Sequence, residues 1–248
     1  MSIALIDADI VAYRSSASAE QDPLEVALVR CDVMMRDILS KEANYIAFLS
    51  GPKEENFRYL LNSEYKANRT APKPRWLVAC KEFLIREYGA LIAHGCEADD
   101  LLGVNQTSES TIYSIDKDLL MIPGAHFNFV TQKYMEVSEL EGLQRFYKQI
   151  LIGDTSDNIF GIRGIGKAKA AKLIDHLNVE QDMFDVVQQL FDTEAEDLGD
   201  SRFWETANLI WIWRINEETY SKRMDRLTSE ELHYEYPESR IKEMAAEV

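Results

Sequence analysis

Closely spaced acidic residues are the first feature of this 248-residue chain that could do chemistry. The densest group lies in "HGCEADDLLG", His94 to Gly103, where Glu97, Asp99 and Asp100 fall within four positions. Acidic residues at the start of a helix are favoured by the helix dipole, so a solvated helix start is one interpretation. Carboxylate oxygens are also the ligands that suit hard divalent ions such as Mg²⁺ or Mn²⁺. This segment alone leaves both interpretations open.

The elements that would position these acids can be predicted from hydrophobic spacing. Short apolar runs predict buried strands, and they cover Ser2–Ile6, Tyr45–Leu49, Ala90–Ala93, Thr111–Ile115 and Phe127–Val130. Helical spacing marks 23–40 and 75–88, and the pattern after Ser138 is helical throughout, over 139–152, 167–177, 183–191 and 202–220. Strands that alternate with helices predict an α/β fold with a mostly parallel central sheet flanked by helices, followed by a helical region.

Further carboxylates fall where the predicted strands end. Asp7 follows the first strand, and Asp116 and Asp118 follow the fourth in "SIDKD". Asp154 and Asp157 in "IGDTSDN" join them if the helical region folds back over that edge. The ligand crevice of an open parallel sheet lies outside the carboxyl ends of its strands, so these acids are expected to converge there. Their mutual repulsion favours two divalent ions roughly 4 Å apart, an arrangement that suits phosphodiester hydrolysis.

Some of these acids also have ordinary structural interpretations. A single "DKD" is usually a turn, and Asp9 is expected to be a helix cap or turn residue. The sequential order of the acids at strand ends is the more specific signal.

Positive and negative charges are distributed unevenly along the chain. A net charge of −16 argues against a nucleic-acid ligand if the surface is uniform. However, 64–88 contains six basic and three acidic residues, and 160–176 contains four basic and one acidic. Residues 177–248 contain 18 acidic and 7 basic residues, so most of the negative charge belongs to the C-terminal part. Two basic segments could therefore still bind phosphates.

The first basic segment is "GIRGIGKAKAAKLI", Gly161 to Ile174. Its three glycines could let the backbone turn tightly and its amides approach a phosphate, immediately before a helix rich in lysine. The candidate DNA-binding residues are Gly161, Gly164, Ile165, Gly166, Lys167, Lys169 and Lys172. The spacing is not that of a nucleotide P-loop, which excludes an ATPase of that class. The alternative is a glycine turn between two helices with solvated lysines.

The second basic segment is "NSEYKANRTAPKPR", residues 62–75. Lys66 and Arg69 are three positions apart and would share one face of a helix. Tyr65 offers a ring for stacking on a base, and Lys73 and Arg75 add further positive charge. A solvated surface is the alternative interpretation.

The sequence also predicts the cellular location of the protein and the redox state of its cysteines. No apolar run approaches the roughly 20 residues of a membrane span, and the N-terminus lacks the features of a signal peptide, so we expect a cytoplasmic protein without membrane contact. Cys31, Cys80 and Cys96 are odd in number and lack zinc spacing, so we expect reduced core thiols.

Together, five segments in order resemble the 5′ nuclease family, which contains flap endonucleases, the 5′ to 3′ exonuclease domain of bacterial DNA polymerase I and bacteriophage 5′ to 3′ exonucleases. They are "LIDADIVAYR", "SEYKANR", "CEADDLLG", "SIDKDLL" and "GDTSDNIFGIRGIGKAKAAKLI", and they span about Ile3 to Lys172. The C-terminal "ANLIWIWRINEE" is similar to phage exonucleases, which would place the protein in a bacterial host cytoplasm.

The resemblance implies a specific architecture and site. It implies a 5′ nuclease or PIN-like core over 1–137 with a helical arch at about 51–88, and a helical DNA-binding region over 138–248 with a helix-hairpin-helix at about 154–177. Asp7, Glu97 and Asp99 would surround one Mg²⁺ or Mn²⁺, with Asp100 bound through water. Asp116, Asp118, Asp154 and Asp157 would surround the second ion. Lys66 and Arg69 would contact the scissile phosphate, Tyr65 would stack near the strand terminus, and Gly161–Lys172 would grip duplex DNA with a potassium ion among its carbonyls.

The implied activity is metal-dependent hydrolysis of DNA by a 5′-3′ exonuclease or flap endonuclease that selects structure rather than sequence. We expect a monomer acting on duplexes with a 5′ end or flap, with RNA–DNA hybrids as a further substrate. One departure concerns the second strand, after which the family carries another metal aspartate. Here Leu49 and Ser50 stand in its place, and Glu54 or Glu55 could substitute only if their loop folds inward. A structure-selective DNA-binding homologue without cleavage and an RNA-directed nuclease are the alternatives.

Overall fold

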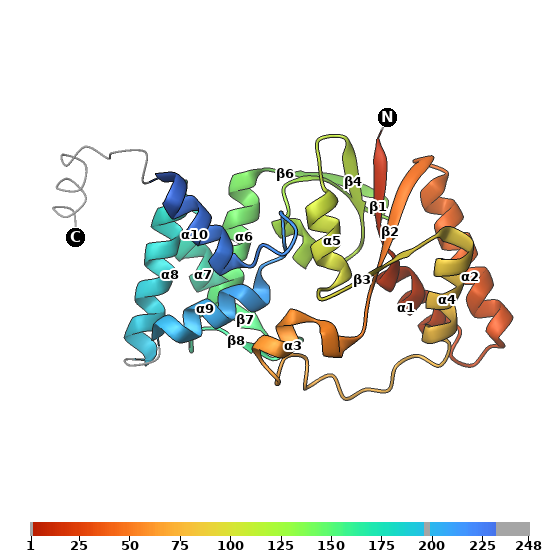
Figure 1. Cartoon of the computed structure of the whole chain (residues 1–248), viewed down its shortest axis with the longest axis horizontal. Helices are drawn as coiled ribbons and strands as arrows, with labels where there is room; N and C mark the ends of the chain where they lie inside the picture. The colour runs from red at the N-terminus through yellow and green to blue at the C-terminus, as the bar shows by residue number, and fades with distance from the viewer. Residues whose placement is uncertain (1, 196–198, 232–248) are drawn as a thin grey trace.

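A computed structural model of the chain describes residues 2–195 and 199–231. Its centre is a six-stranded sheet in the order β3-β2-β1-β4-β5-β6 (Figure 1). The strands are β1 (Ile3–Asp7), β2 (Asn44–Ser50), β3 (Leu91–Ala93), β4 (Ser110–Tyr113), β5 (Gly124–Asn128) and β6 (Lys133–Val137). All neighbours pair in parallel except β5 and β6, which are antiparallel. This arrangement confirms the predicted mostly parallel sheet and adds β6, which the apolar pattern missed because its residues up to Glu136 are exposed.

One face of the sheet is covered by α1 (Ala8–Ser18), α2 (Leu24–Leu39) and α4 (Leu77–Tyr88) (Figure 1). Side chains alternate across a strand, so Ala4 and Ile6 pack on this face whereas Leu5 packs on the other. Cys31 and Cys80 lie buried and free in the same hydrophobic cluster. Cys96 is likewise buried and free, so all three cysteines are core thiols, as the sequence predicted.

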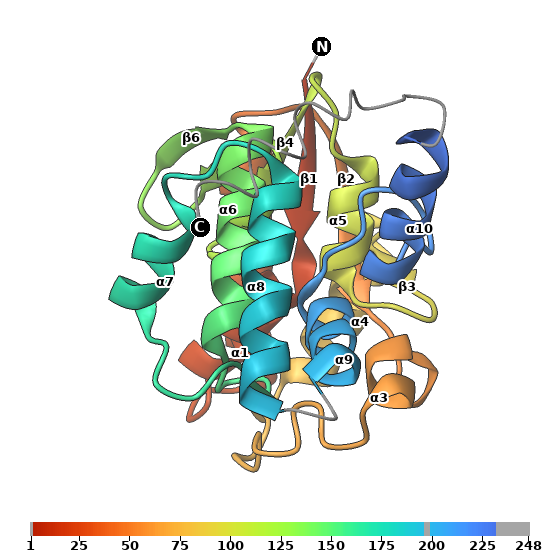
Figure 2. The ribbon, with the colours of Figure 1, turned by 90° about the vertical axis from the view of Figure 1, so that its left-hand side faces the viewer.

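The opposite face carries α5 (Ala98–Asn105) and α6 (Glu139–Ile152) (Figure 2). α6 is contacted by α7 (Lys167–Ile174), α8 (Glu180–Ala195) and α9 (Gly199–Ile210), and α10 (Tyr220–Glu231) packs against α9. Within the described ranges, every helix is too short or too polar to cross a lipid bilayer.

The predicted single helix over 202–220 is wrong, because α9 ends at Ile210 and α10 begins only at Tyr220. Several groups of the intervening backbone bond to distant side chains. The carbonyl of Trp211 accepts from Arg58 and the amide of Trp213 donates to Asp100. Tertiary hydrogen bonds therefore end this helix where the local pattern would continue it.

The segment predicted as a helical arch, 51–88, is only partly helical. A 3₁₀ turn (Lys53–Glu55) and the short helix α3 (Phe57–Leu61) are followed by turns and extended chain up to α4 (Figure 1). Lys66 has a φ of 57°, in the left-handed region, and Pro72 and Pro74 lack the amide hydrogen that a helix interior requires. Lys66 and Arg69 therefore lie on a turn rather than on one helical face.

The segment predicted as a helix-hairpin-helix, 154–177, contains one helix, α7, and α6 ends just before it. A two-stranded ribbon of β7 (Gly153–Asp154) and β8 (Ile159–Phe160) joins α6 to the glycine turn before α7. Gly161 packs so tightly that an added Cβ would lie 2.4 Å from the Leu151 carbonyl oxygen. The glycine therefore allows the turn to lie directly against the end of α6.

A single hydrophobic cluster runs across the predicted domain boundary at residue 138. It joins Leu5 and Phe48 of the sheet to Phe146 of α6, and it continues to Trp211 and Tyr220. The C-terminal helices thus share a core with the sheet. Residues 196–198 and 232–248 of the predicted helical region lie outside the described residues.

Candidate active site at the carboxyl edge of the sheet

Carboxylates from separate parts of the chain gather at the carboxyl edge of the sheet. A small cavity of about 40 Å³ lies among them, lined by Glu97, Asp99, Asp118, Asp154 and Asp157. These residues come from the start of α5, the turn after β4 and the β7–β8 ribbon. The convergence expected from strand ends is therefore present, including the contribution of the folded-back ribbon.

Asp7 lies at the centre of this edge, at the last position of β1. Its side chain caps α1 by accepting from the Ile10 amide at 3.2 Å, and it accepts from the Ser114 hydroxyl at 2.7 Å. Burial raises the pKa of Asp7 to about 7, and the charges of Asp9 and Asp116 add to the effect. The cap is thus Asp7, whereas Asp9, predicted to be a cap or turn residue, lies in the first turn of α1.

The neighbouring acids repel one another. Burial, together with the charges of Asp7 and Asp116, raises the pKa of Asp99 well above its usual range. Burial raises the pKa of Asp118 to about 6, and the charges of Asp116 and Asp154 contribute. Asp116 is therefore close to both groups, where an added cation would relieve the repulsion.

Two basic residues of the 62–75 segment reach the same acids. Lys66 Nζ lies 2.5 Å from Glu97 Oε1 and 3.6 Å from Asp157 Oδ2. Arg69 Nη2 also pairs with Asp157. Burial opposes the charge on Lys66, but Glu97 and Asp157 together raise its pKa. The sequence predicted these two cations as phosphate contacts, and here they neutralise carboxylates.

These ion pairs decide how the site can accept metal. Among the described residues, no three His, Cys, Asp or Glu side chains are already arranged around one point as metal ligands. The donor set nevertheless fits divalent ions, because its oxygens are hard ligands and several of the acids have raised pKa values that a cation would lower. Binding of metal would require Lys66 to yield its position beside Glu97.

Asp100 is not a metal ligand of this edge, contrary to the prediction. Its side chain is fully buried and forms a two-bond ion pair with Arg58, at 2.6 and 2.8 Å. It also accepts from the amides of Glu97 and Trp213. Four donors occupy the carboxylate, so it holds elements together instead of binding an ion.

Arg58 is the residue that sequence reasoning missed. It extends from α3 with only 3% of its side chain exposed, and it donates to the carbonyls of Leu209 and Trp211 as well as to Asp100. Its partners are 42 to 153 positions away. The absence of local spacing explains why no sequence pattern marked it.

Tyr65 does not offer a free ring for stacking, which corrects that prediction. The residue is 2% exposed, and its hydroxyl lies 2.9 Å from Glu97 Oε2 and 3.2 Å from Asp157 Oδ2. Tyr65 therefore orients two of the site carboxylates. Lys73 and Arg75 are exposed, and the Arg75 amide donates to Glu20, so neither joins the carboxylates.

The loop after β2 does not supply the carboxylate that Leu49 and Ser50 lack. Glu54 and Glu55 are exposed, and Glu55 lies beside His94. Ser50 bonds to another acid, Asp9, whose Oδ2 accepts from the Ser50 amide at 2.7 Å and whose Oδ1 pairs with Lys81 at 2.5 Å. A lysine-bound aspartate thus stands next to this position.

A basic groove lies next to the carboxylates, between α6 and α7. It has a volume of about 480 Å³, and its lining joins Asp118 and Asp154 to four cations, Lys117, Arg145, Lys148 and Lys167. The sequence analysis named only Lys167 of these four. Lys169 and Lys172 are exposed on α7, Ile165 is buried under the turn, Gly164 has a φ of 79°, and Gly166 precedes α7 as its cap.

No family model matches the chain. It is 30% identical over 215 residues to the protein named 5′-3′ exonuclease of Mycoplasma pneumoniae, an alignment that covers 73% of this chain and 74% of that protein. The chain belongs to the 5′-3′ exonuclease family. It is also 26% identical to a flap endonuclease Xni of Shewanella baltica, over 64% of this chain and 68% of that protein. These relatives confirm the resemblance seen in the sequence and identify the chain as a nuclease by family.

Solved structures support the fold. The T5 D15 protein co-crystallised with metal ions superposes with a TM-score of 0.59 and 16% identity, over 94% of this chain and 99% of that one. The T5 D15 flap endonuclease in a complex with DNA and metal ions superposes with a TM-score of 0.55 and 15% identity, over 85% of this chain and 99% of that one. The α/β fold predicted from the sequence is thereby confirmed.

Proposed function

We propose that this nuclease is a metal-dependent 5′-3′ exonuclease and flap endonuclease that hydrolyses DNA phosphodiesters. The observation that carries the proposal is the convergence of carboxylates from α5, the β4 turn and the β7–β8 ribbon beside a groove lined by cations. Relatives named for 5′-3′ exonuclease and flap endonuclease activity support the same reaction.

Two divalent ions, Mg²⁺ or Mn²⁺, would be held at this edge. Asp7, Glu97 and Asp99 would hold one, and Asp116, Asp118, Asp154 and Asp157 the other. When bound, such a pair supplies an activated water nucleophile and stabilises the leaving 3′ oxygen. A solved neighbour co-crystallised with metal ions supports this part of the proposal.

The side chains of the chain itself would bind and orient the substrate. In this proposal Lys66 and Arg69 leave their carboxylates when metal and DNA enter, and then donate to the oxygens of the scissile phosphate. Tyr65 keeps Glu97 and Asp157 in place by its hydroxyl. The cations of the groove would hold the duplex by its backbone, so selection would follow structure and depend on salt.

The turn Gly161–Gly166 and the lysines Lys167, Lys169 and Lys172 belong to the same duplex-binding surface of the proposal. A potassium ion among the carbonyls of that turn, action on RNA–DNA hybrids and a monomeric state are further parts of it.

The test is cleavage of end-labelled DNA offered as blunt duplex, nicked duplex and 5′ flap, with and without Mg²⁺. We expect Mg²⁺-dependent products, and product lengths separate release of mononucleotides from excision of flaps. Asp116→Ala should lower the rate by more than about 100-fold while the protein stays folded. Asp185→Ala, which removes an exposed acid on α8, is the matched control. Cleavage in the presence of a chelator, or an unchanged rate for Asp116→Ala, would refute the proposal.

A second candidate is a structure-selective DNA-binding protein without cleavage. It is favoured by Ser50 in place of an acid and by the cations that already occupy Glu97 and Asp157. It predicts binding of the flap substrate with no Mg²⁺-stimulated product. A parallel arm with RNA substrates tests the RNA-directed alternative.

A further inference from the structure

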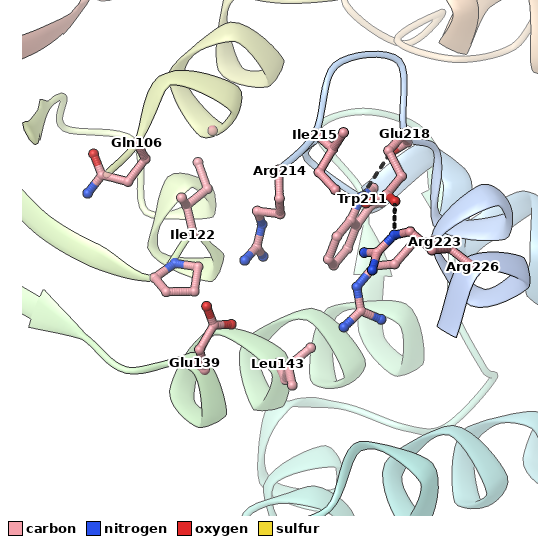
Figure 3. Close-up of a pocket in the computed structure, with 12 residues that line it drawn as sticks. Gln106, Ile122, Glu139, Leu143, Trp211, Arg214, Ile215, Glu218, Arg223 and Arg226 are labelled. Atoms are coloured by element: carbon pink, nitrogen blue, oxygen red, sulfur yellow. Dashed lines mark hydrogen bonds and ion pairs between the residues drawn. The ribbon is translucent and has the colours of Figure 1, made fainter. Parts of the chain in front are cut away.

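A second pocket lies away from the acidic edge, at the far end of α5 (Figure 3). α5 begins beside Glu97 and Asp99, whereas Gly103 and Gln106 at its other end line this pocket. The cavity has a volume of about 270 Å³. Three arginines extend into it from the segment after α9 and from α10, namely Arg214, Arg223 and Arg226. The pocket is therefore separate from the candidate active site and differs from it in charge.

Arg214 is the unusual cation of this pocket. It points from the loop after Trp213 towards the start of α6 (Figure 3), and its guanidinium carbon lies 4.6 Å from the centre of the Trp211 ring. One nitrogen donates to the Met121 carbonyl. Its Nε is enclosed and has no hydrogen-bond partner within the part of the chain that the structure describes. Burial removes much of the hydration of this cation and lowers the pKa of Arg214 to about 10.

The other two arginines are already paired. Arg223 forms a two-bond ion pair with Glu180, at 2.5 and 2.6 Å, and Arg226 Nε donates to Glu218 Oε1 at 2.8 Å. The other oxygen of Glu218, Oε2, is enclosed without a hydrogen-bond partner among the described residues. Two residues of the pocket lining thus each have one unsatisfied atom, a cationic donor on Arg214 and an acceptor on Glu218, and a ligand with complementary groups would compensate them.

The charges limit what the ligand can be. With Arg223 and Arg226 paired, the pocket retains Arg214, and the nearby carboxylates are the exposed Glu139 and the buried Glu218. A doubly charged phosphate would be repelled by both carboxylates, whereas a singly charged carboxylate matches the one cation. The edge of a guanidinium also suits the two oxygens of a carboxylate. A single carboxylate is therefore the favoured anion.

The rest of the lining is apolar. Ile122 lies on one side, Leu143 of α6 lies on another, and Ile215 is 50% exposed (Figure 3). Pro123 also lines the pocket. A volume of about 270 Å³ accommodates a carboxylate with one medium-sized apolar group. Burial of such a group against these side chains would add to the affinity.

We propose that this pocket binds a carboxylate that carries an apolar group and a hydrogen-bond donor, with the carboxylate on the Arg214 guanidinium and the donor on the Glu218 carboxylate. The C-terminal residue of a peptide and an N-acylated amino acid share this chemistry, because both have a carboxylate, an apolar side chain and an amide N–H. The proposal concerns binding and does not depend on the cleavage reaction.

The experiment is calorimetric titration of the full chain with four probes. They are N-acetyl-leucine, the uncharged N-acetyl-leucinamide, the peptide acetyl-Gly-Gly-Leu and adenosine 5′-monophosphate. We expect N-acetyl-leucine to bind with a Kd of about 1 mM or tighter and the uncharged amide at least tenfold more weakly. A peptide that binds more tightly than N-acetyl-leucine identifies a chain end as the source, and equal affinity identifies a free small molecule.

Two variants test the assignment. Arg214→Gln should weaken the binding of N-acetyl-leucine at least tenfold. A thermal melt of the variant checks that it is folded. Because Arg214 also bonds to Met121, a second variant, Ile215→Glu, places a repelling charge at an exposed position of the pocket lining and should weaken binding to the same degree. Val78→Glu makes the same change at an apolar residue of α4 that is 69% exposed, and it should leave binding unchanged.

Three results would overturn the proposal. They are no saturable binding of N-acetyl-leucine, equal binding of the uncharged amide, and Arg214-dependent binding of adenosine monophosphate without binding of N-acetyl-leucine.

Discussion

Replacing either member of the Arg58–Asp100 pair should destabilise the protein strongly. Arg58 and Asp100 are 3% and 0% exposed, and Arg58 donates four hydrogen bonds, two of them to Asp100. Removing one partner leaves a buried charge without compensation, a loss of about 3–5 kcal/mol in the free energy of unfolding. We therefore expect Arg58→Met and Asp100→Asn each to lower that free energy by about 3 kcal/mol or more.

The double variant tests whether the two residues act as a pair. Arg58→Met combined with Asp100→Asn leaves no buried charge, so its loss should be smaller than the sum of the two single losses by at least about 1 kcal/mol. The assay is equilibrium urea unfolding followed by far-ultraviolet circular dichroism, with the denaturant slope compared among variants.

A surface pair provides the control for this measurement. Arg36 pairs with Asp32 at 3.0 Å, but its side chain is 76% exposed, so Arg36→Met should change stability by no more than about 0.5 kcal/mol. Single losses below about 1 kcal/mol, or additive losses in the double variant, would refute the structural role assigned to Asp100. A loss that Mg²⁺ enlarges would instead favour the metal-ligand interpretation.

Three further predictions concern pH, packing and DNA. The pKa of Asp7 is raised to about 7 from 3.8, so the folded protein binds an extra proton between these values. Stability without divalent ions should then fall as pH rises from about 4 to 7, and Asp7→Asn should flatten a plot of melting temperature against pH. Gly161→Ala should cost about 2 kcal/mol or more by urea unfolding, because its Cβ would meet backbone at 2.4 Å, whereas Gly166→Ala has open space and should cost little. Lys169→Glu should weaken binding of a 5′-flap DNA and reduce the slope of log affinity against log salt by about 1, and an unchanged slope would exclude Lys169 as a phosphate contact.

The sheet could be predicted from the sequence because the apolar runs that indicate strands are local signals. Each of the five predicted strands overlaps an observed strand, and the acids after β1 and β4 fall at the carboxyl edge because parallel strands all end there. Alternation within a strand, as at Ala4 and Leu5, also separates the two hydrophobic clusters in the expected way.

The prediction failed where distant residues decide the structure. Asp100 lies next to Asp99 in the sequence and was predicted to join the same metal site. In the structure it pairs instead with Arg58, which is 42 positions away. The helix predicted through Trp211 ends there because Arg58 takes its carbonyl. The unpaired donor of Arg214 likewise depends on tertiary packing, because Arg223 and Arg226, which follow it by 9 and 12 positions, do pair with carboxylates.

Arg58 also fixes when the acidic edge can form during synthesis. Its two carbonyl acceptors belong to Leu209 and Trp211, so a nascent chain that has emerged only as far as β8 has all seven acids proposed to bind metal but cannot satisfy this buried guanidinium. The ribosome must release about 50 further residues before the last acceptor is available. The order of translation therefore delays assembly of the acidic edge until most of the polypeptide has left the exit tunnel.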